Sequence, residues 1–306
     1  MELGIALPTS GALASPANIG RIARGAEQLG YDALWTYERL LRPIGNVQQP
    51  GGGPPQPLPE SYGVAYEPLE TLSYVAALTS TIKLGTSVID ALFHPPVVLA
   101  RRFATLDQFS GGRVVAGLGQ GWMREEFEAA GVPPRRKGAG MDEAVAAMRA
   151  CWGEDPVRFE GRFYRIAPSE VNPKPVQRHI PILLGAMTPA GIERAARIAD
   201  GLNPIGFSAE AVQGLVSAFH EAARAAGRDP ASLTVVVRAN VPITADPLGD
   251  DRPFLGGSPA QIAADLALLD GVDGVDGVLI SNTAPTQIDA ELRLLEQLQA
   301  AVGKQA

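Results

Sequence analysis

Two segments of the chain have the residue types and spacing needed to hold a phosphate or a flat ring. In the first, a short apolar run is separated from a helix expected to begin near Pro189 by Gly185, Ala186, Met187 and Thr188. Backbone N–H groups at a helix start, aided by the helix dipole, form an anion site. An ordinary helix start capped by Thr188 explains the same residues. The two interpretations are compatible.

The second segment ends another apolar run and reads Gly117-Leu118-Gly119-Gln120-Gly121. Glycines at a strand end let the backbone approach a flat ring or a phosphate closely. The segment lacks the G-x-G-x-x-G spacing of a nicotinamide-binding loop, because Trp122 stands where the third glycine would fall. A tight turn between a strand and a helix explains these glycines equally well.

Short apolar runs alternate with amphipathic stretches along the chain, as in proteins built from βα units with a parallel sheet. Strands are expected at residues 3–8, 33–36, 82–88, 113–118, 182–184, 201–203, 233–243 and 278–281. Helices are expected at 16–29, 68–80, 95–109, 123–151 with interruptions, 189–199, 209–226, 258–269 and 288–302. Eight strands favour a closed (β/α)₈ TIM barrel over an open doubly wound sheet. Because such barrels form one unit of roughly 250 residues or more, we expect a single domain over residues 1–306.

Two insertions interrupt this repeat, at about residues 43–66 and 153–178. The first is dense in proline and glycine and follows the second strand, in a βα position. Active sites of barrels are built from βα loops, so this insertion is a candidate lid; a disordered surface loop is the alternative. The second insertion contains an expected hairpin at residues 159–164 and an extended Pro173-Lys174-Pro175.

The bulk composition excludes several classes of protein. A net charge of −7 and a pI near 5.1 argue against non-specific nucleic-acid binding, which needs a basic surface. No apolar run approaches the roughly 20 residues of a membrane helix. Cys151 is the only cysteine, so neither an internal disulfide nor a thiolate metal cage can form. We therefore expect a cytoplasmic protein with no metal, nucleic-acid or membrane partner.

A set of short segments is more specific as an ordered group than any one of them is alone. They are Gly30-Tyr31-Asp32-Ala33-Leu34-Trp35, residues 82–88 with His94-Pro95, Thr105-Leu106-Asp107, Ser110-Gly111-Gly112-Arg113, residues 117–122, Glu125-Glu126-Phe127, residues 159–164, Pro173-Lys174-Pro175 and residues 195–201. In this order, across about residues 1–205, they resemble the luciferase-like monooxygenase superfamily. Residues 38–43 and the compact length resemble its F420-dependent oxidoreductase branch.

The resemblance implies a TIM barrel with a flavin or deazaflavin ring at the carboxyl ends of the strands. It implies a non-proline cis peptide at Ser87-Val88, behind the ring. The residues that it assigns to cofactor binding are Ser87, Val88, Gly119, Gln120 and Gly121, with Gly185, Ala186, Met187 and Thr188 around the phosphate. It also implies coenzyme F420, or alternatively FMN, together with a small-molecule substrate, a homodimer and a separate F420 or flavin reductase.

At the end of the second strand, F420-dependent relatives often carry an Asp-His pair, and this chain departs from that pattern. Here the segment reads Tyr37-Glu38-Arg39. Glu38 can hydrogen-bond the ring or relay a proton, provided that burial raises its pKa. Arg39 stays protonated and cannot act as a general base, but it can stabilise an anionic ring or bind a substrate carboxylate. A structural ion pair between Glu38 and Arg39 is the alternative.

Two further residues are assigned by their place in the resemblance. Trp122 stands where some sugar-phosphate-oxidising relatives carry a catalytic acid, so the same acid catalysis and the same substrate are in doubt. An aromatic side chain there, with Tyr37, can form the wall of an apolar substrate pocket, although a core tryptophan is the plain alternative. His94 follows the third strand and can donate to the ring or the substrate near neutral pH; a packed structural histidine is the alternative.

The function expected from these observations is F420-dependent hydride transfer between carbon 5 of the deazaflavin and a small organic substrate, with Glu38, Arg39 and His94 as catalytic candidates. One alternative is an FMNH₂-dependent monooxygenase on the same scaffold. A second alternative, kept open by the missing Asp-His pair and by Trp122, is a non-catalytic flavin- or deazaflavin-binding protein. The sequence leaves the substrate and the direction of reaction open.

Overall fold

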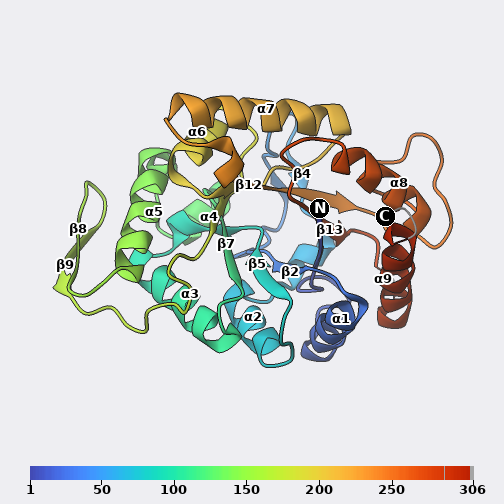
Figure 1. Ribbon diagram of the computed structural model, residues 1–306, viewed down its shortest axis with the longest axis horizontal. Coiled ribbons are helices and arrows are strands. Elements are labelled where there is room, and N and C mark those ends of the chain that lie inside the picture. The colour runs from blue at the N-terminus through green and yellow to red at the C-terminus, as the bar shows by residue number, and fades with distance from the viewer. Residues whose placement is uncertain (286, 304–306) are drawn as a thin grey trace.

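Eight parallel strands form a closed barrel in the computed structural model, which describes residues 1–285 and 287–303 (Figure 1). The strands are β1 (Glu2–Ala6), β2 (Ala33–Thr36), β5 (Lys83–Thr86), β7 (Val114–Gly119), β10 (Ile182–Leu184), β11 (Gly201–Leu202), β12 (Thr234–Val241) and β13 (Gly277–Asn282). Each pairs in parallel with its neighbours, β10 pairs with β7, and β13 pairs with β1, which closes the ring. The (β/α)₈ barrel predicted from the sequence is confirmed.

Helices surround the barrel and follow the strands along the chain (Figure 1). They are α1 (Pro16–Leu29), α2 (Pro68–Ala76), α3 (Pro96–Ser110), α4 (Arg124–Ala129), α5 (Ala139–Trp152), α6 (Pro189–Ile198), α7 (Ala209–Ala225), α8 (Pro259–Asp270) and α9 (Ile288–Val302). Side-chain caps from Ser15, Thr188 and Ser208 fix the starts of α1, α6 and α7. No helix of the described chain is long and apolar enough to cross a membrane.

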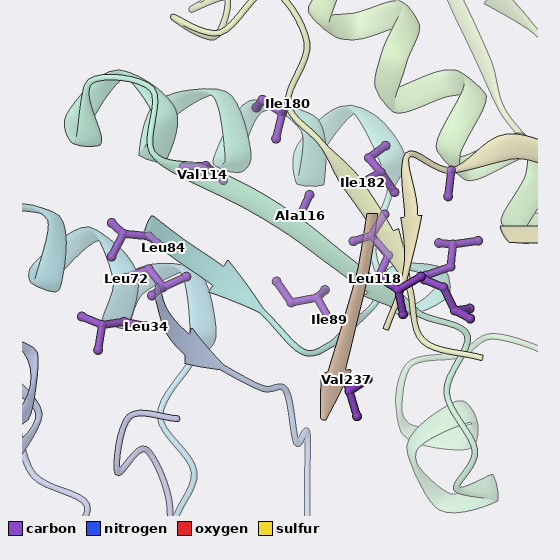
Figure 2. Packing of buried hydrophobic residues seen from close by; sticks show 14 of the residues in the cluster. Leu34, Leu72, Leu84, Ile89, Val114, Ala116, Leu118, Ile180, Ile182 and Val237 are labelled. Atoms are coloured by element: carbon purple, nitrogen blue, oxygen red, sulfur yellow. The ribbon is translucent and has the colours of Figure 1, made fainter. Parts of the chain in front are cut away.

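Apolar residues line both surfaces of the barrel, because side chains alternate along each strand. The inward-facing set is Ala33, Trp35, Leu183, Val236 and Leu279. The outward-facing set packs under the helices and includes Leu34, Leu84, Ala116, Leu118 and Ile182 (Figure 2). The interior of the barrel is therefore a packed core with no room for a ligand inside it.

The insertion at residues 43–66 is folded onto the segments that follow β2 and β7. It contains the short antiparallel pair β3 (Asn46–Val47) and β4 (Gln56–Pro57) and a single turn of 3₁₀ helix, Glu60–Gly63. Val47 and Leu58 are buried with Met123, and Leu41, Tyr62 and Trp122 pack beside them. The Arg42 guanidinium donates to the carbonyl oxygens of Leu58 and Pro59. These contacts bring Tyr62 to the carboxyl end of the barrel.

The insertion at residues 153–178 forms a hairpin, as predicted, with β8 (Val157–Glu160) antiparallel to β9 (Arg165–Ser169). It projects from the body of the molecule beside α5 (Figure 1). The Glu143 carboxylate of α5 accepts backbone N–H groups of Arg162, Phe163 and Tyr164 at the hairpin turn. Because it connects a helix to the following strand, this hairpin lies away from the βα loops of the opposite end.

Candidate active site at the carboxyl end of the barrel

The chain bulges where β5 ends, and this bulge is the centre of the candidate site. The Ser87–Val88 peptide bond is cis, as the resemblance implies. After it the chain returns as β6 (Ile89–Asp90), which pairs with the end of β7. The Thr86 hydroxyl donates to the carbonyl oxygen of Gly117 over 2.7 Å and ties the bulge to β7.

Glycines surround the Val88 side chain. A Cβ atom on Gly119 would lie 2.5 Å from Val88 Cγ2, and one on Gly185 would lie 3.1 Å from Val88 Cγ1. Any side chain at Gly119 would therefore displace the bulge. The two glycines make room for the Val88 side chain against the backbone. Val88, Gly119 and Gly185 are together called the cradle below.

Gln120 and Gly121 have contacts within the protein. The Gln120 side-chain oxygen accepts the backbone N–H of Gly138 over 2.6 Å and holds the start of α5. Gly121 has φ 74°, which favours glycine, and its N–H donates to Asp90 Oδ1 over 2.8 Å. Their assignment to the cofactor stays a prediction, whereas these structural contacts explain the residue types directly.

The segment that was predicted to bind a phosphate precedes α6. The Thr188 hydroxyl accepts the N–H of Gly191 over 3.3 Å and caps the helix, and the Gly185 N–H donates to the carbonyl oxygen of Leu118. Among the described residues, no acceptor is bonded to the N–H groups of Ala186, Met187 or Thr188. These three amides therefore have the capacity to bind an anion, and the capping role of Thr188 holds as well.

Glu38 and His94 form a carboxylate–imidazole couple. Glu38 Oε1 lies 2.6 Å from His94 Nε2, and Glu38 Oε2 accepts the backbone N–H of Asp90 over 2.9 Å. The Glu38 side chain is 2% exposed and that of His94 is 15% exposed. A buried carboxylate in this position fixes the orientation of the imidazole. The chain thus pairs an acid from the end of β2 with a histidine 56 residues away.

Asp90 lies next to this couple, since its backbone N–H donates to Glu38. It was not predicted as a site residue. Burial, and next the negative charge of Glu38, raise the pKa of the Asp90 carboxyl to about 7. The hydrogen bond from Gly121 opposes this shift. The sequence gives no signal for such a shift, because it depends on the proximity of two acids from different strands.

The raised pKa of Asp90 predicts a pH-dependent stability. Between its ordinary pKa of 3.8 and about 7, the folded protein holds a proton that the unfolded chain releases. This contribution to stability is complete below the ordinary pKa and is lost as the pH rises through 7. Asp90→Asn keeps an acceptor for the Gly121 N–H without a charge. From pH 5 to pH 8 we expect the wild type to lose about 2–3 kcal/mol of unfolding free energy relative to this variant.

Urea unfolding at pH 5, 6, 7 and 8 measures this difference. The exposed Asp250→Asn variant is the control and should follow the wild type at every pH. Parallel profiles for the wild type and Asp90→Asn would show that Asp90 is charged throughout this range.

Arg39 is paired with a different acid from the one expected. Its Nη1 donates to Glu126 Oε2 over 2.7 Å, and the Arg39 and Glu126 side chains are 8% and 1% exposed. The Arg39 guanidinium also lies over the rings of Tyr62, at 5.1 Å, and Trp122, at 5.4 Å. The alternative of a Glu38–Arg39 ion pair is therefore wrong. The charge of Arg39 is neutralised within the protein, which leaves it little capacity to hold a ligand anion.

Arg238 of β12 is a site residue that the sequence analysis missed. Its Nη1 donates to Ser87 Oγ over 3.2 Å, its Nε donates to Asn240 Oδ1 over 2.9 Å, and its guanidinium lies 5.4 Å from the centre of the Tyr37 ring. Ser87 Oγ in turn lies 2.5 Å from the side-chain oxygen of Asn203. A signal existed, since Val236 faces the barrel interior and side chains two positions apart share a face.

The first comparison with known proteins concerns sequence. A family model described as luciferase-like monooxygenase matches residues 1–247. An uncharacterised protein of Mycobacterium tuberculosis is 37% identical over 206 residues, which are 66% of this chain and 71% of the relative. An F420-dependent glucose-6-phosphate dehydrogenase of Kineococcus radiotolerans is 32% identical over 61% of this chain and 52% of its own length. An FMNH₂-dependent dimethylsulfone monooxygenase of Pseudomonas putida is 31% identical over 51% of this chain and 44% of its own length.

The second comparison concerns solved structures. A monooxygenase of Streptomyces bottropensis superposes with a TM-score of 0.81 at 25% identity and covers 100% of this chain and 99% of that chain. A coenzyme F420-dependent tetrahydromethanopterin reductase of Methanopyrus kandleri superposes with a TM-score of 0.80 at 19% identity and covers 99% of both chains. The second likeness shows the fold alone.

Proposed function

The chain belongs to the luciferase-like monooxygenase family, and on that premise we propose that it is an F420-dependent oxidoreductase that transfers a hydride between carbon 5 of the deazaflavin and a small organic substrate. The relatives divide between proteins named for F420 and proteins named for FMNH₂. Membership of the family is therefore compatible with either cofactor. The choice between F420 and FMN has to be argued from the side chains of this site.

The observation that carries the proposal is the Glu38–His94 couple. A dehydrogenase that moves a hydride to or from a carbonyl or alcohol carbon must also move a proton at the oxygen. A histidine oriented by a buried carboxylate is suited to that task near neutral pH. The couple takes the place of the Asp-His pair that F420-dependent relatives often carry, although its histidine comes from a different element.

The residues at the barrel mouth fit a deazaflavin or a flavin. We assign the cradle of Val88, Gly119 and Gly185 to the ring, and the free amides of Ala186, Met187 and Thr188 to the phosphate. When bound, the deazaflavin supplies a hydride acceptor or donor at carbon 5.

The protein's own residues would supply position and protons. His94 would exchange a proton with the substrate oxygen, and Glu38 would stabilise the imidazolium that results. The Arg39–Glu126 pair, held between Tyr62 and Trp122, would keep the insertion at residues 43–66 in place over the site. Burial of the reacting groups under this insertion would exclude water and strengthen their electrostatic interactions.

The competing proposal is an FMNH₂-dependent monooxygenase, which the Pseudomonas putida and Streptomyces bottropensis relatives support. The same cradle and the same helix start would serve FMN. Such an enzyme would receive its reduced flavin from a partner reductase and would consume oxygen, whereas an F420-dependent enzyme needs no oxygen. The homodimer and the cytoplasmic location stay predictions.

A titration of the purified protein with F420 and with FMN, followed by fluorescence, tests the proposal. We expect F420 to bind at least tenfold more tightly than FMN, a difference of about 1.4 kcal/mol. A preference for FMN together with oxygen uptake would replace the proposal with the monooxygenase. Binding of F420 without hydride exchange against any substrate of a broad panel would favour a non-catalytic binding protein.

A further inference from the structure

Arg238 is a positive charge at the barrel mouth that has no carboxylate partner among the described residues. In the part of the chain that the structure describes, its hydrogen bonds go only to neutral oxygens, Ser87 Oγ and Asn240 Oδ1. No acidic side chain forms an ion pair with it across residues 1–285 and 287–303. Its other nitrogen, Nη2, donates to no acceptor among the same residues.

Several other partly buried arginines are paired with an acid, unlike Arg238. Arg39 is paired with Glu126, Arg149 with Asp200, Arg194 with Asp142 and Arg252 with Asp265. Arg113 forms no ion pair within the described part of the chain but donates to five oxygens at the end of α2, in the α2–β5 connection and at the end of α3. Arg42 and Arg228 likewise have no acid among the described residues and donate to backbone carbonyl oxygens, and Arg136 lies over the rings of Phe163 and Tyr164. Arg238 differs from them in its place, because it lies beside the cis bulge at the barrel mouth.

An uncompensated cation in this position is unfavourable for the protein alone. Burial lowers the pKa of the Arg238 guanidinium, and the nearby charge of Arg39 acts in the same direction. The aromatic face of Tyr37 offsets only part of this penalty. A bound oxyanion would remove the penalty, because carboxylates and phosphates pair with the planar guanidinium through two parallel hydrogen bonds.

Arg238 also has the right place for a substrate contact. It reaches Ser87 next to the cis bulge and Tyr37 at the end of β2, so it spans the mouth from β12 to the opposite strands. Ser87 and Tyr37 themselves are engaged, since Ser87 contacts Asn203 and the Tyr37 hydroxyl lies 2.6 Å from Ser10 Oγ. The Arg238 guanidinium, by contrast with the Ser87 and Tyr37 hydroxyls, still has a nitrogen, Nη2, that can donate to a ligand.

We propose that Arg238 binds an anionic group of the substrate, so that the protein acts on small hydroxy or keto carboxylates. This inference rests on the proposed function for the reaction, but the anion site itself depends only on Arg238 and its surroundings. The same oxyanion chemistry has a second source, the negatively charged ring of a reduced cofactor, and the experiment separates the two.

The test uses a panel of hydroxy and keto carboxylates, each matched with its neutral amide, titrated into F420-loaded wild-type protein by calorimetry. At least one acid should bind, with its amide at least tenfold weaker. Arg238→Gln should weaken that acid at least tenfold and leave the amide unchanged, and Arg238→Lys should retain part of the affinity. Arg135→Gln, which removes an exposed charge elsewhere, should change neither. If acids and amides bind alike, or if no acid binds, the inference is wrong.

Two further binding measurements distinguish a substrate site at Arg238 from a contact of Arg238 with the cofactor. Arg238→Gln should keep the wild-type affinity for oxidised and for reduced F420; a selective loss of reduced F420 of tenfold or more would assign the oxyanion to the cofactor and overturn the substrate site. Wild-type protein that binds FMN and not F420 would overturn the proposed cofactor instead. The same panel would then be applied to the FMN-loaded protein, where an acid preference lost in Arg238→Gln would still support the anion site. Far-ultraviolet circular dichroism and urea unfolding confirm that each variant is folded.

Discussion

Glu38→Gln is expected to lower kcat by about 10²–10⁴-fold, the usual contribution of a positioned acid–base group. The glutamine oxygen would still accept the N–H of Asp90, which Glu38 Oε2 accepts in the wild type. Its NH₂ group would then face His94, where it can only donate, so the protonated imidazole would lose its stabilising partner. We expect F420 affinity to remain within about twofold of the wild type, because Glu38 does not belong to the proposed ring or phosphate contacts.

A double-mutant cycle with His94→Gln tests whether the two residues act as one unit. Measured with the first substrate that the wild type turns over, the double variant should be no slower than the slower single variant. Glu128→Gln, an exposed acid on α4 paired with Arg124, is the matched control and should retain wild-type kcat. If the fold-losses of kcat in the two single variants multiply in the double variant, Glu38 and His94 act separately.

Glu126→Gln is expected to have the largest effect on stability, a loss of about 3–5 kcal/mol in the free energy of unfolding, because it leaves Arg39 buried without its counter-charge. Burial raises the pKa of Glu126 although Arg39 opposes the shift. Desolvation of this pair is therefore only partly offset by attraction, so the pair adds little net stability while the loss of one member is severe. Arg39→Met with Glu126→Leu should recover most of the loss, since replacing both charges by apolar groups is often nearly neutral.

The same helix provides a matched control for this prediction. Arg124 and Glu128 form an ion pair on α4 with side chains that are 80% and 59% exposed. Glu128→Gln should therefore cost less than about 1 kcal/mol. Urea unfolding of the variants gives the comparison directly, and similar losses for Glu126→Gln and Glu128→Gln would show that the Arg39–Glu126 pair is not desolvated in solution.

The barrel could be predicted from the sequence because each strand and helix carries its own local signal. Short apolar runs, bounded by glycine at helix ends and by Ser or Thr at helix starts, placed all eight barrel strands. Helix α1 has the predicted bounds, and α2 ends at Ala76, earlier than the predicted residue 80. The helical region at 123–151 resolves into α4 and α5, separated at the prolines and glycines that interrupt the pattern.

The partners within the site could not be predicted in the same way. Glu38 and Arg39 are adjacent in sequence, yet their side chains pair with His94 and Glu126, 56 and 87 residues away. Which side chains meet at the carboxyl end depends on how far each strand continues past its neighbours and on the bulge at Ser87–Val88. The distance between these side chains is set by the order of the strands around the closed barrel. The spacing of the residues along the chain therefore does not predict which of them meet.

The packed interior of the barrel has a consequence for the order in which ligands exchange. Trp35, Leu183, Val236 and Leu279 fill the space beneath the site, so molecules can reach and leave it only from the carboxyl side of the barrel. Two ligands that must lie face to face there cannot pass each other. If the hydride carrier takes the deeper position, substrate always meets a loaded protein, and the carrier leaves only after the product. Turnover would then follow a compulsory sequence, in which slow departure of the carrier limits how fast electrons reach any other redox protein.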